Sequence, residues 1–347
     1  MKPILTRRSA LRLTGIVGGV LACPALLRAQ SLKAEYKLSV VGNRPLGTTE
    51  AAFRWAELVA ERTQGRINIR VYPGSQLLGG DQTREFVAMR QGVIDMNVAS
   101  TINLAPQIRE MNLFSLPFIM PDHKAFDALT SGDVRADLDA VLASREAVAL
   151  AWSENGFRQL SNSKRSLRKP DDLRGLKIRY AAGQIYADIF NALGANPLQM
   201  SWADLQPALA TGAVDGQETP VNVFLSSQLD RVSQRYLSVW NYVADANICL
   251  VSKAVWEGFA PADRDIVRAS AEQAASEHTA SSRKGVVGTD RSSFDELKRR
   301  NVEVVELSDS EKAPFKAATR PVFDKWAQTI GGDLVKKAEG SVAKRNA

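Results

Sequence analysis

Strand-like and helix-like patterns alternate along most of this 347-residue chain, and this alternation restricts the possible fold more than any other feature. Residues 37–41 have a strand-like apolar pattern, residues 48–64 have helical spacing and stop at Gly65, and residues 67–71 alternate apolar and polar side chains. The order strand, helix, strand is a β-α-β unit. It predicts an α/β fold with a mostly parallel sheet, in which ligands bind near the carboxyl ends of the strands.

The same alternation continues to the end of the chain. Residues 262–301 are Ala-rich, charged and free of proline, and predict one long helix bent near Gly285 and Gly288. At 1.5 Å per residue such a helix would run about 55 Å, which is enough to bridge two lobes. Ser308 and Glu311 resemble a capping box that begins a C-terminal helix. Further helices are predicted at 81–91, 125–142, 184–193 and 204–211, and further strands at 93–99, 148–152, 176–180, 247–252 and 302–307.

The charge of the chain is concentrated at its N-terminus. The formal net charge is +7, but residues 1–29 hold five basic residues and no acid. Removing them leaves 45 − 5 = 40 basic against 38 acidic residues, a net charge of +2. No run of Lys and Arg interleaved with aromatic residues follows, so the sequence does not favour nucleic-acid binding.

Residues 1–29 are typical of an export signal. A basic start with Arg7 and Arg8 precedes an apolar run at 13–27 that is too short to span a bilayer. The paired arginines resemble the twin-arginine signal, although Ala10 stands where that pattern prefers a large apolar residue. We expect cleavage near residues 29–30 and a periplasmic mature protein, while Cys23 offers an alternative as a lipoprotein cleavage site.

The sequence offers little for catalysis or metal binding. It lacks a Gly-x-Ser-x-Gly motif, a phosphate-cradling loop and a dinucleotide fingerprint. Neither His123 nor His278 has a second His or Cys at metal-ligand spacing, and Cys249 would be the only cysteine after cleavage. We therefore expect no enzyme, no metal and no cofactor. An exported two-lobed α/β enzyme and a ligand-sensing domain remain as alternative functions.

Two arginines in distinct motifs suggest an anion site. They are Arg158 in Asn155-Gly156-Phe157-Arg158 and Arg179 in Gly175-Leu176-Lys177-Ile178-Arg179. A planar guanidinium can grip a carboxylate through two parallel hydrogen bonds, so the pair indicates a site for an organic acid.

These motifs belong to a wider resemblance. The chain resembles the solute-binding proteins of tripartite ATP-independent periplasmic (TRAP) transporters, the DctP family. Further matching stretches, in family order, are residues 71–81, 92–95, Leu116-Pro117-Phe118, residues 172–179 and residues 212–220. The resemblance implies a two-lobed periplasmic binding protein with mixed sheets and a long interlobe helix, which closes on an organic acid and delivers it to a membrane permease.

The resemblance also implies the residues of the site. Arg179 matches the arginine that pairs with the substrate carboxylate, and Arg158 a second cationic contact. Ser100 and Trp202 match a polar contact and an aromatic wall, and Thr219 stands where several members have asparagine. Further polar contacts are expected at Asn43, Gln217, Glu218 and Asn222. For Arg179 the alternative is a structural salt bridge, for Trp202 a place in the core, and for Glu218 a hinge role.

The resemblance divides the chain into two lobes. The first is expected at 30–154, completed by about 245–283, and the second at 155–244, completed by about 284–340, with a disordered tail at 341–347. The ligand could be a C4-dicarboxylate, a sugar acid or a 2-oxo acid, and the sequence does not choose between them.

Overall fold

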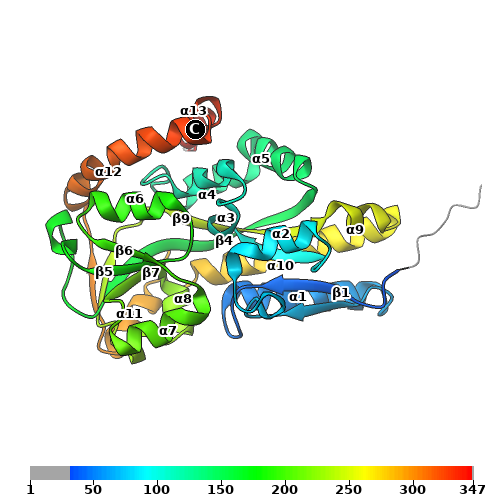
Figure 1. The fold of residues 1–347 in the computed structure, drawn as a ribbon, viewed down its shortest axis with the longest axis horizontal. Helices are drawn as coiled ribbons and strands as arrows, with labels where there is room; N and C mark the ends of the chain where they lie inside the picture. The colour runs from blue at the N-terminus through cyan, green and yellow to red at the C-terminus, as the bar shows by residue number, and fades with distance from the viewer. Residues whose placement is uncertain (1–31, 346–347) are drawn as a thin grey trace, which may run out of the picture. The chain divides into compact units, whose positions relative to one another are not determined.

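A computed structural model describes residues 32–345, so the predicted export signal lies outside the described residues. Its centre is a mixed sheet with strand order β2-β1-β3-β9-β4-β7-β5-β6, and β8 pairs with both β4 and β10 (Figure 1). The strands are β1 (Tyr36–Val40), β2 (Ile69–Tyr72), β3 (Met96–Ser100), β4 (Ala147–Asn162), β5 (Lys177–Tyr180), β6 (Asn196–Gln199), β7 (Gly216–Pro220), β8 (Tyr236–Val239), β9 (Ala244–Ser252) and β10 (Glu303–Glu306).

Helices cover both faces of this sheet, as expected for an α/β fold. The α-helices are α1 (Gly47–Arg62), α2 (Glu85–Arg90), α3 (Thr101–Leu104), α4 (His123–Ser131), α5 (Asp133–Ser144), α6 (Gln184–Ala192), α7 (Trp202–Thr211), α8 (Val221–Ser226), α9 (Lys253–Gly258), α10 (Pro261–Arg283), α11 (Ser292–Arg299), α12 (Asp309–Ile330) and α13 (Gly332–Lys344). Short 3₁₀ helices lie at Gln76–Leu78, Gln82–Arg84, Arg109–Ser115, Pro170–Leu173 and Leu229–Val232.

The strand β4 joins the two halves of the sheet. Its first part pairs with β9 and its last part with β7 and β8, in each case antiparallel. The parallel pairs are β1 with β2 and β3, β5 with β6 and β7, and β8 with β10. Five of the nine strand pairs are parallel, and the four antiparallel pairs are those of β4 and β9, so the sheet is mixed, as the family resemblance implies. We call β2-β1-β3 with α1 the first half and β7-β5-β6 with α6 to α8 the second half.

Two predicted helices are interrupted by glycine. The expected helix at 262–301 ends at Arg283, and a second helix, α11, begins at Ser292. Between them Gly285 and Gly288 have φ values of +78° and +63°, a region that residues with a Cβ avoid. The expected helix at 125–142 is likewise two helices, α4 and α5, separated at Gly132.

Other expectations agree with the structure. The capping box of Ser308 and Glu311 begins α12, with the Ser308 side chain accepting from the Glu311 N–H and the carboxylate accepting in return. One expectation differs: the sequence predicted a disordered tail at 341–347, but residues 341–344 form the last turn of α13, and residues 346–347 lie outside the described residues.

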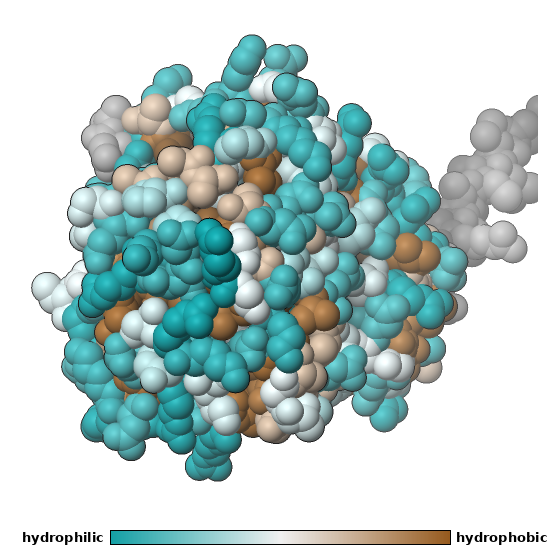
Figure 2. Space-filling view, turned by 60° about the vertical axis from the view of Figure 1, so that its left-hand side comes forward, coloured by the Kyte–Doolittle hydropathy of each residue, from teal (hydrophilic) through white to brown (hydrophobic). Residues whose placement is uncertain are grey.

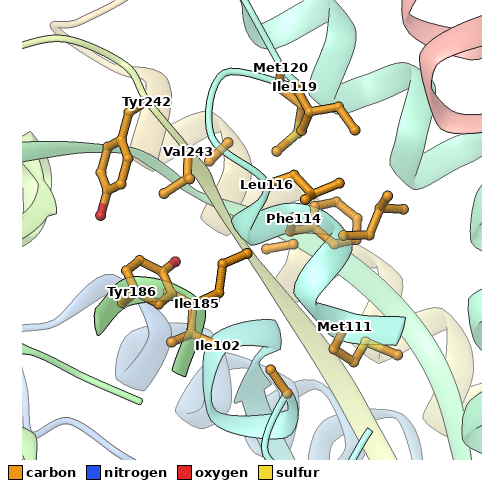
Figure 3. Packing of buried hydrophobic residues seen from close by; sticks show 14 of the residues in the cluster. Ile102, Met111, Phe114, Leu116, Ile119, Met120, Ile185, Tyr186, Tyr242 and Val243 are labelled. Carbon is orange, nitrogen blue, oxygen red and sulfur yellow. The ribbon is translucent and has the colours of Figure 1, made fainter. Parts of the chain in front are cut away.

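Apolar residues fill the space between the sheet and its helices. Figure 3 shows part of the largest cluster, in which Phe114 and Leu116 pack with Tyr186 of α6 and with Tyr242, which precedes β9. On the face shown in Figure 2 polar residues predominate, and apolar residues form small separate patches. Within residues 32–345, no helix combines the length and the hydrophobicity that crossing a membrane would require.

Candidate functional site

A cavity of about 80 Å³ opens between the two halves of the sheet, where strands from both halves end. Its wall combines apolar and polar side chains. The apolar lining residues are Val40, Val41, Leu46, Val98, Ile102, Ala181 and Val223, and the polar or aromatic ones are Thr48, Gln82, Ser100, Asn103, Asn155, Arg158, Arg179, Trp202, Thr219, Asp245 and Asn247. Such a mixture suits a small ligand that carries a few polar groups.

Arg179 lines this cavity as a buried cation without an anionic partner. It lies in β5 and is 1% exposed. Its Nε donates to the backbone oxygen of Met200 at 3.0 Å, and its guanidinium carbon lies 5.8 Å from the centre of the Trp202 ring. Its Nη2 is buried without a hydrogen-bond partner. Within residues 32–345, no carboxylate forms an ion pair with this guanidinium, which therefore has donors available for a ligand.

Burial governs the pKa of Arg179. It disfavours the charged form and lowers the pKa from 12.5 to about 10, although the nearby Glu218 carboxylate acts in the opposite direction. The side chain thus remains a cation at neutral pH, in an environment that favours an added negative charge.

Arg158, in β4, is buried to the same degree but is already paired. Its Nε and Nη2 donate to the two carboxylate oxygens of Glu218, and its Nη1 donates to Asp245 Oδ2 at 2.9 Å. The backbone oxygen of Glu218 accepts a further bond at 2.6 Å. Burial alone would lower the pKa of Arg158, but the Glu218 and Asp245 carboxylates more than offset this and raise the pKa well above its usual value.

Asp245 is the acid of the cavity wall and accepts three hydrogen bonds. Besides Arg158, Ser100 Oγ donates to its Oδ1 at 2.6 Å and Asn155 Nδ2 donates to its Oδ2 at 3.0 Å. The three donors come from β3 and β4, and Asp245 lies at the start of β9. This network fixes the polar wall of the cavity before any ligand binds.

Two amide groups of the wall keep unused hydrogen-bonding capacity. Asn247 Nδ2 and Asn155 Oδ1 are buried and have no partner. Buried polar atoms are nearly always hydrogen-bonded, so an unpaired donor and an unpaired acceptor beside the cavity point to groups of a ligand. The Arg179 guanidinium is the third member of this set.

The structure brings five of the expected site residues together and leaves four outside the cavity wall. Arg179, Arg158, Ser100, Trp202 and Thr219 line the cavity.

The other four lie elsewhere. Glu218 is fully buried behind Arg158, and its Oε2 also accepts from Tyr242 Oη at 2.8 Å. Gln217 donates to Ser161 Oγ at 2.9 Å in the second half.

Asn222 and Asn43 also lie outside this wall. The Asn222 side chain donates to Ser282 Oγ at 3.3 Å, near the end of α10. Asn43 is exposed, and its side chain lies against Gly74.

Three of the polar wall residues that the sequence reasoning missed are Asp245, Asn247 and Gln82. Asp245 and Asn247 are polar residues two positions apart in the otherwise apolar strand β9, so they share a face of the sheet. This signal was available, but the predicted strand began only at Asn247. The third, Gln82, accepts from the backbone N–H of Trp202 at 2.8 Å and so connects the two halves across the cavity. Nothing in the local sequence indicates this long-range contact.

Two groups that could take part in catalysis are placed elsewhere. His123 lies beside Glu154, with 2.7 Å between Nδ1 and Oε1. Cys249 is buried, and burial raises the pKa of its thiol to about 12. Among residues 32–345 no three His, Cys, Asp or Glu side chains are grouped as metal ligands.

Comparison with known proteins gives consistent results. Residues 43–329 match the family model of the bacterial extracellular solute-binding proteins, family 7. The chain is 32% identical to the 2,3-diketo-L-gulonate-binding periplasmic protein YiaO of Escherichia coli, over 90% of this chain and 92% of that protein. It is 29% identical to the C4-dicarboxylate-binding periplasmic protein DctP of Rhodobacter capsulatus, over 98% of this chain and 100% of that protein.

Solved structures show the same fold. A TRAP periplasmic solute-binding protein from Ralstonia eutropha, solved with bound (S)-2-hydroxy-2-methyl-3-oxobutanoate, is 52% identical, with a TM-score of 0.89 over 90% of this chain and 99% of that chain. The sugar acid binding protein DctPAm from Advenella mimigardefordensis, in complex with galactonate, is 26% identical, with a TM-score of 0.84 over 90% and 99% of the two chains. The two-lobed α/β fold that the sequence predicts is therefore confirmed.

Proposed function

The chain belongs to family 7 of the bacterial extracellular solute-binding proteins, which serve TRAP transporters as binding proteins and not as enzymes, and from this premise we propose how it holds its ligand. It captures a small organic acid in the cavity between the two halves, and Arg179 pairs with the carboxylate. The observation that carries this proposal is the buried Arg179 guanidinium, which has no anionic partner while Arg158 beside it has two.

The energetics favour an anionic ligand. A carboxylate loses its hydration when it enters a closed cavity, and charge-assisted hydrogen bonds from a guanidinium offset that cost. Arg179 has itself already lost its hydration, because it is 1% exposed and its Nη2 has no partner. Binding therefore adds the missing charge to a site whose cation is already in place, and little side-chain entropy is lost.

The unpaired polar atoms of the wall indicate an acid with hydroxyl or oxo substituents. Asn247 Nδ2 can donate to an oxo or hydroxyl oxygen, and Asn155 Oδ1 can accept from a hydroxyl. The ligand of the Ralstonia protein, a five-carbon acid with one hydroxyl and one oxo group, has this combination.

The family and the predicted export signal indicate the compartment in which the protein works. A protein exported by the signal at residues 1–29 and cleaved near residue 29 would work in the periplasm and deliver its acid to the membrane permease of a TRAP transporter. Relatives named as periplasmic support this proposal.

Isothermal titration calorimetry tests the role of Arg179. A thermal-shift screen of short hydroxy and oxo acids, including 2-hydroxy-2-methyl-3-oxobutanoate, identifies a ligand, and its affinity is then measured for the wild type and for Arg179→Ala. We expect the substitution to cost about 2–5 kcal/mol of binding free energy, the range seen when one member of a buried charged pair is truncated.

The matched control is Arg174→Ala, which removes an exposed arginine of the loop just before β5. It should bind as the wild type does. If Arg179→Ala bound the acid as tightly as Arg174→Ala, the proposed role of Arg179 would be wrong.

A further inference from the structure

Asp245 is a buried carboxylate in the wall of a cavity that takes an anion. It is 2% exposed and lines the cavity together with Arg158 and Arg179. A fixed negative charge beside an anionic ligand opposes binding unless it has a separate role. Its contacts indicate what that role is.

Asp245 completes the neutralisation of Arg158. Glu218, which is fully buried and lies outside the cavity wall, already engages Nε and Nη2 of the guanidinium. Asp245 Oδ2 accepts a hydrogen bond of 2.9 Å from Nη1, on the remaining edge of the Arg158 guanidinium. One carboxylate would suffice for the charge of Arg158, so the second covers the edge of the guanidinium that a ligand could otherwise reach.

The four charges of the site sum to zero, so the available hydrogen-bond donors, and not the net charge, decide where a ligand carboxylate can bind. Arg158 and Arg179 supply two positive charges, and Glu218 and Asp245 supply two negative charges. Among the described residues of the cavity wall, Arg179 is the cation that has no carboxylate partner. A second carboxylate on the ligand would meet Asp245 instead of an available guanidinium edge.

We propose that Asp245 sets the charge of the ligand: by covering Nη1 of Arg158 it restricts the cavity to acids with a single carboxylate and excludes dicarboxylates of similar length. This inference rests on the proposed function of Arg179. It makes Asp245 a specificity-determining residue and assigns a monocarboxylate as the ligand class.

The isosteric substitution Asp245→Asn removes the charge and can keep the network. Its Oδ1 can accept from Arg158 and Asn155, as Oδ2 of the aspartate does. Its Nδ2 can donate to Ser100 Oγ, because a hydroxyl also accepts hydrogen bonds. The variant should therefore fold and still bind a monocarboxylate, while Arg158 gains net positive charge toward the cavity.

The test compares two acids of equal length that differ in one charge, succinate and its monoamide succinamate, by isothermal titration calorimetry. We expect the wild type to bind succinamate more tightly than succinate. In Asp245→Asn the ratio of the succinate affinity to the succinamate affinity should rise by about tenfold or more, because a like charge close to the second carboxylate is removed. Asp324→Asn, which removes an exposed carboxylate of α12, is the control for net charge and should leave the ratio unchanged.

The possible outcomes separate the inference from the proposed function. A wild type that binds succinate as tightly as succinamate, or an unchanged ratio in a folded Asp245→Asn, overturns the inference while Arg179-dependent binding stands. Binding that does not depend on Arg179 overturns the proposed function instead. If Asp245→Asn fails to fold, the wild-type comparison of the two acids still decides, because it needs no variant.

Discussion

The two arginines of the site illustrate how the same side chain can serve stability or binding, depending on its partners. Arg158 forms ion pairs with two buried carboxylates, so its charge, Glu218 and Asp245 stabilise one another. Arg179 is equally buried but has a single backbone oxygen as its hydrogen-bond partner. A buried charge without a counterion lowers the stability of the ligand-free protein, and this cost is recovered when the ligand binds.

This contrast predicts that two matched substitutions differ in their effects on the free energy of unfolding and on ligand binding. Arg158→Met leaves Glu218 and Asp245 buried without their cation and should lower the free energy of unfolding by about 3–5 kcal/mol. Arg179→Met removes an unpaired buried charge and should change the free energy of unfolding by less than about 1 kcal/mol, while it weakens ligand binding by about 2–5 kcal/mol. Urea denaturation of the ligand-free variants measures both. Equal destabilisation by the two substitutions would contradict the assigned roles.

At this scale the sequence identifies the arginines but not their partners. The motifs and the family resemblance place Arg158 and Arg179 in the site, and both line the cavity. The carboxylates that distinguish them are 60 and 87 residues away from Arg158 along the chain, so only the folded strands show which arginine is neutralised.

At the scale of elements, β4 and α10 carry the connection between the halves. The predicted strand at 148–152 is part of β4, which continues to Asn162 and is buried almost throughout. The prediction stopped early because polar residues follow Trp152, and a buried strand with polar side chains breaks the apolar pattern that sequence reasoning uses. Those same polar residues, among them Asn155 and Arg158, build the site.

Helix α10 packs on α1 and on β4 through buried small residues and through His278. The Nδ1 atom of His278 lies 3.0 Å from Ser153 Oγ of β4, while its Nε2 is buried without a partner. Burial disfavours the charged imidazolium and lowers the pKa of this imidazole from 6.5 to about 4.

The pKa of His278 predicts a loss of stability in acid. The unfolded chain binds a proton at this residue below about pH 6.5 and the folded chain only near pH 4, so the neutral ring contributes fully above pH 6.5 and the contribution is lost as the pH falls toward 4. At about 1.4 kcal/mol per pKa unit, the loss between pH 7 and pH 4 is about 3 kcal/mol. Urea denaturation across this range should show a shallower decline for His278→Gln. Parallel curves for the two proteins would mean that His278 is not buried as a neutral ring.

At the scale of the whole molecule, hydrogen bonds that cross the cavity bear on how the two halves would come together around a ligand, as the proposed function requires. One such contact involves the first residue of α7, because the backbone N–H of Trp202 donates to Gln82 Oε1 of the other half at 2.8 Å. Gln82 Nε2 in turn donates to Asn103 Oδ1 at 2.8 Å, which fixes the amide in the first half. The N–H groups at a helix N-terminus have no intrahelical partners. Gln82 Oε1 supplies an acceptor for one of them, the Trp202 N–H, only while the halves are together.

This contact predicts that Gln82 acts on the closed state. In Gln82→Ala the Trp202 N–H loses its partner when the halves close, whereas water satisfies it when they are apart, so closure should become less favourable by about 1 kcal/mol. The ligand affinity should fall about fivefold, because binding is coupled to the population of the closed form. Small-angle X-ray scattering should show a smaller ligand-induced decrease in the radius of gyration at subsaturating acid. Gln206→Ala, which removes a hydrogen bond within the second half, is the control and should leave both measurements unchanged. Wild-type affinity and compaction in Gln82→Ala would show that the Gln82–Trp202 contact does not help to hold the halves together.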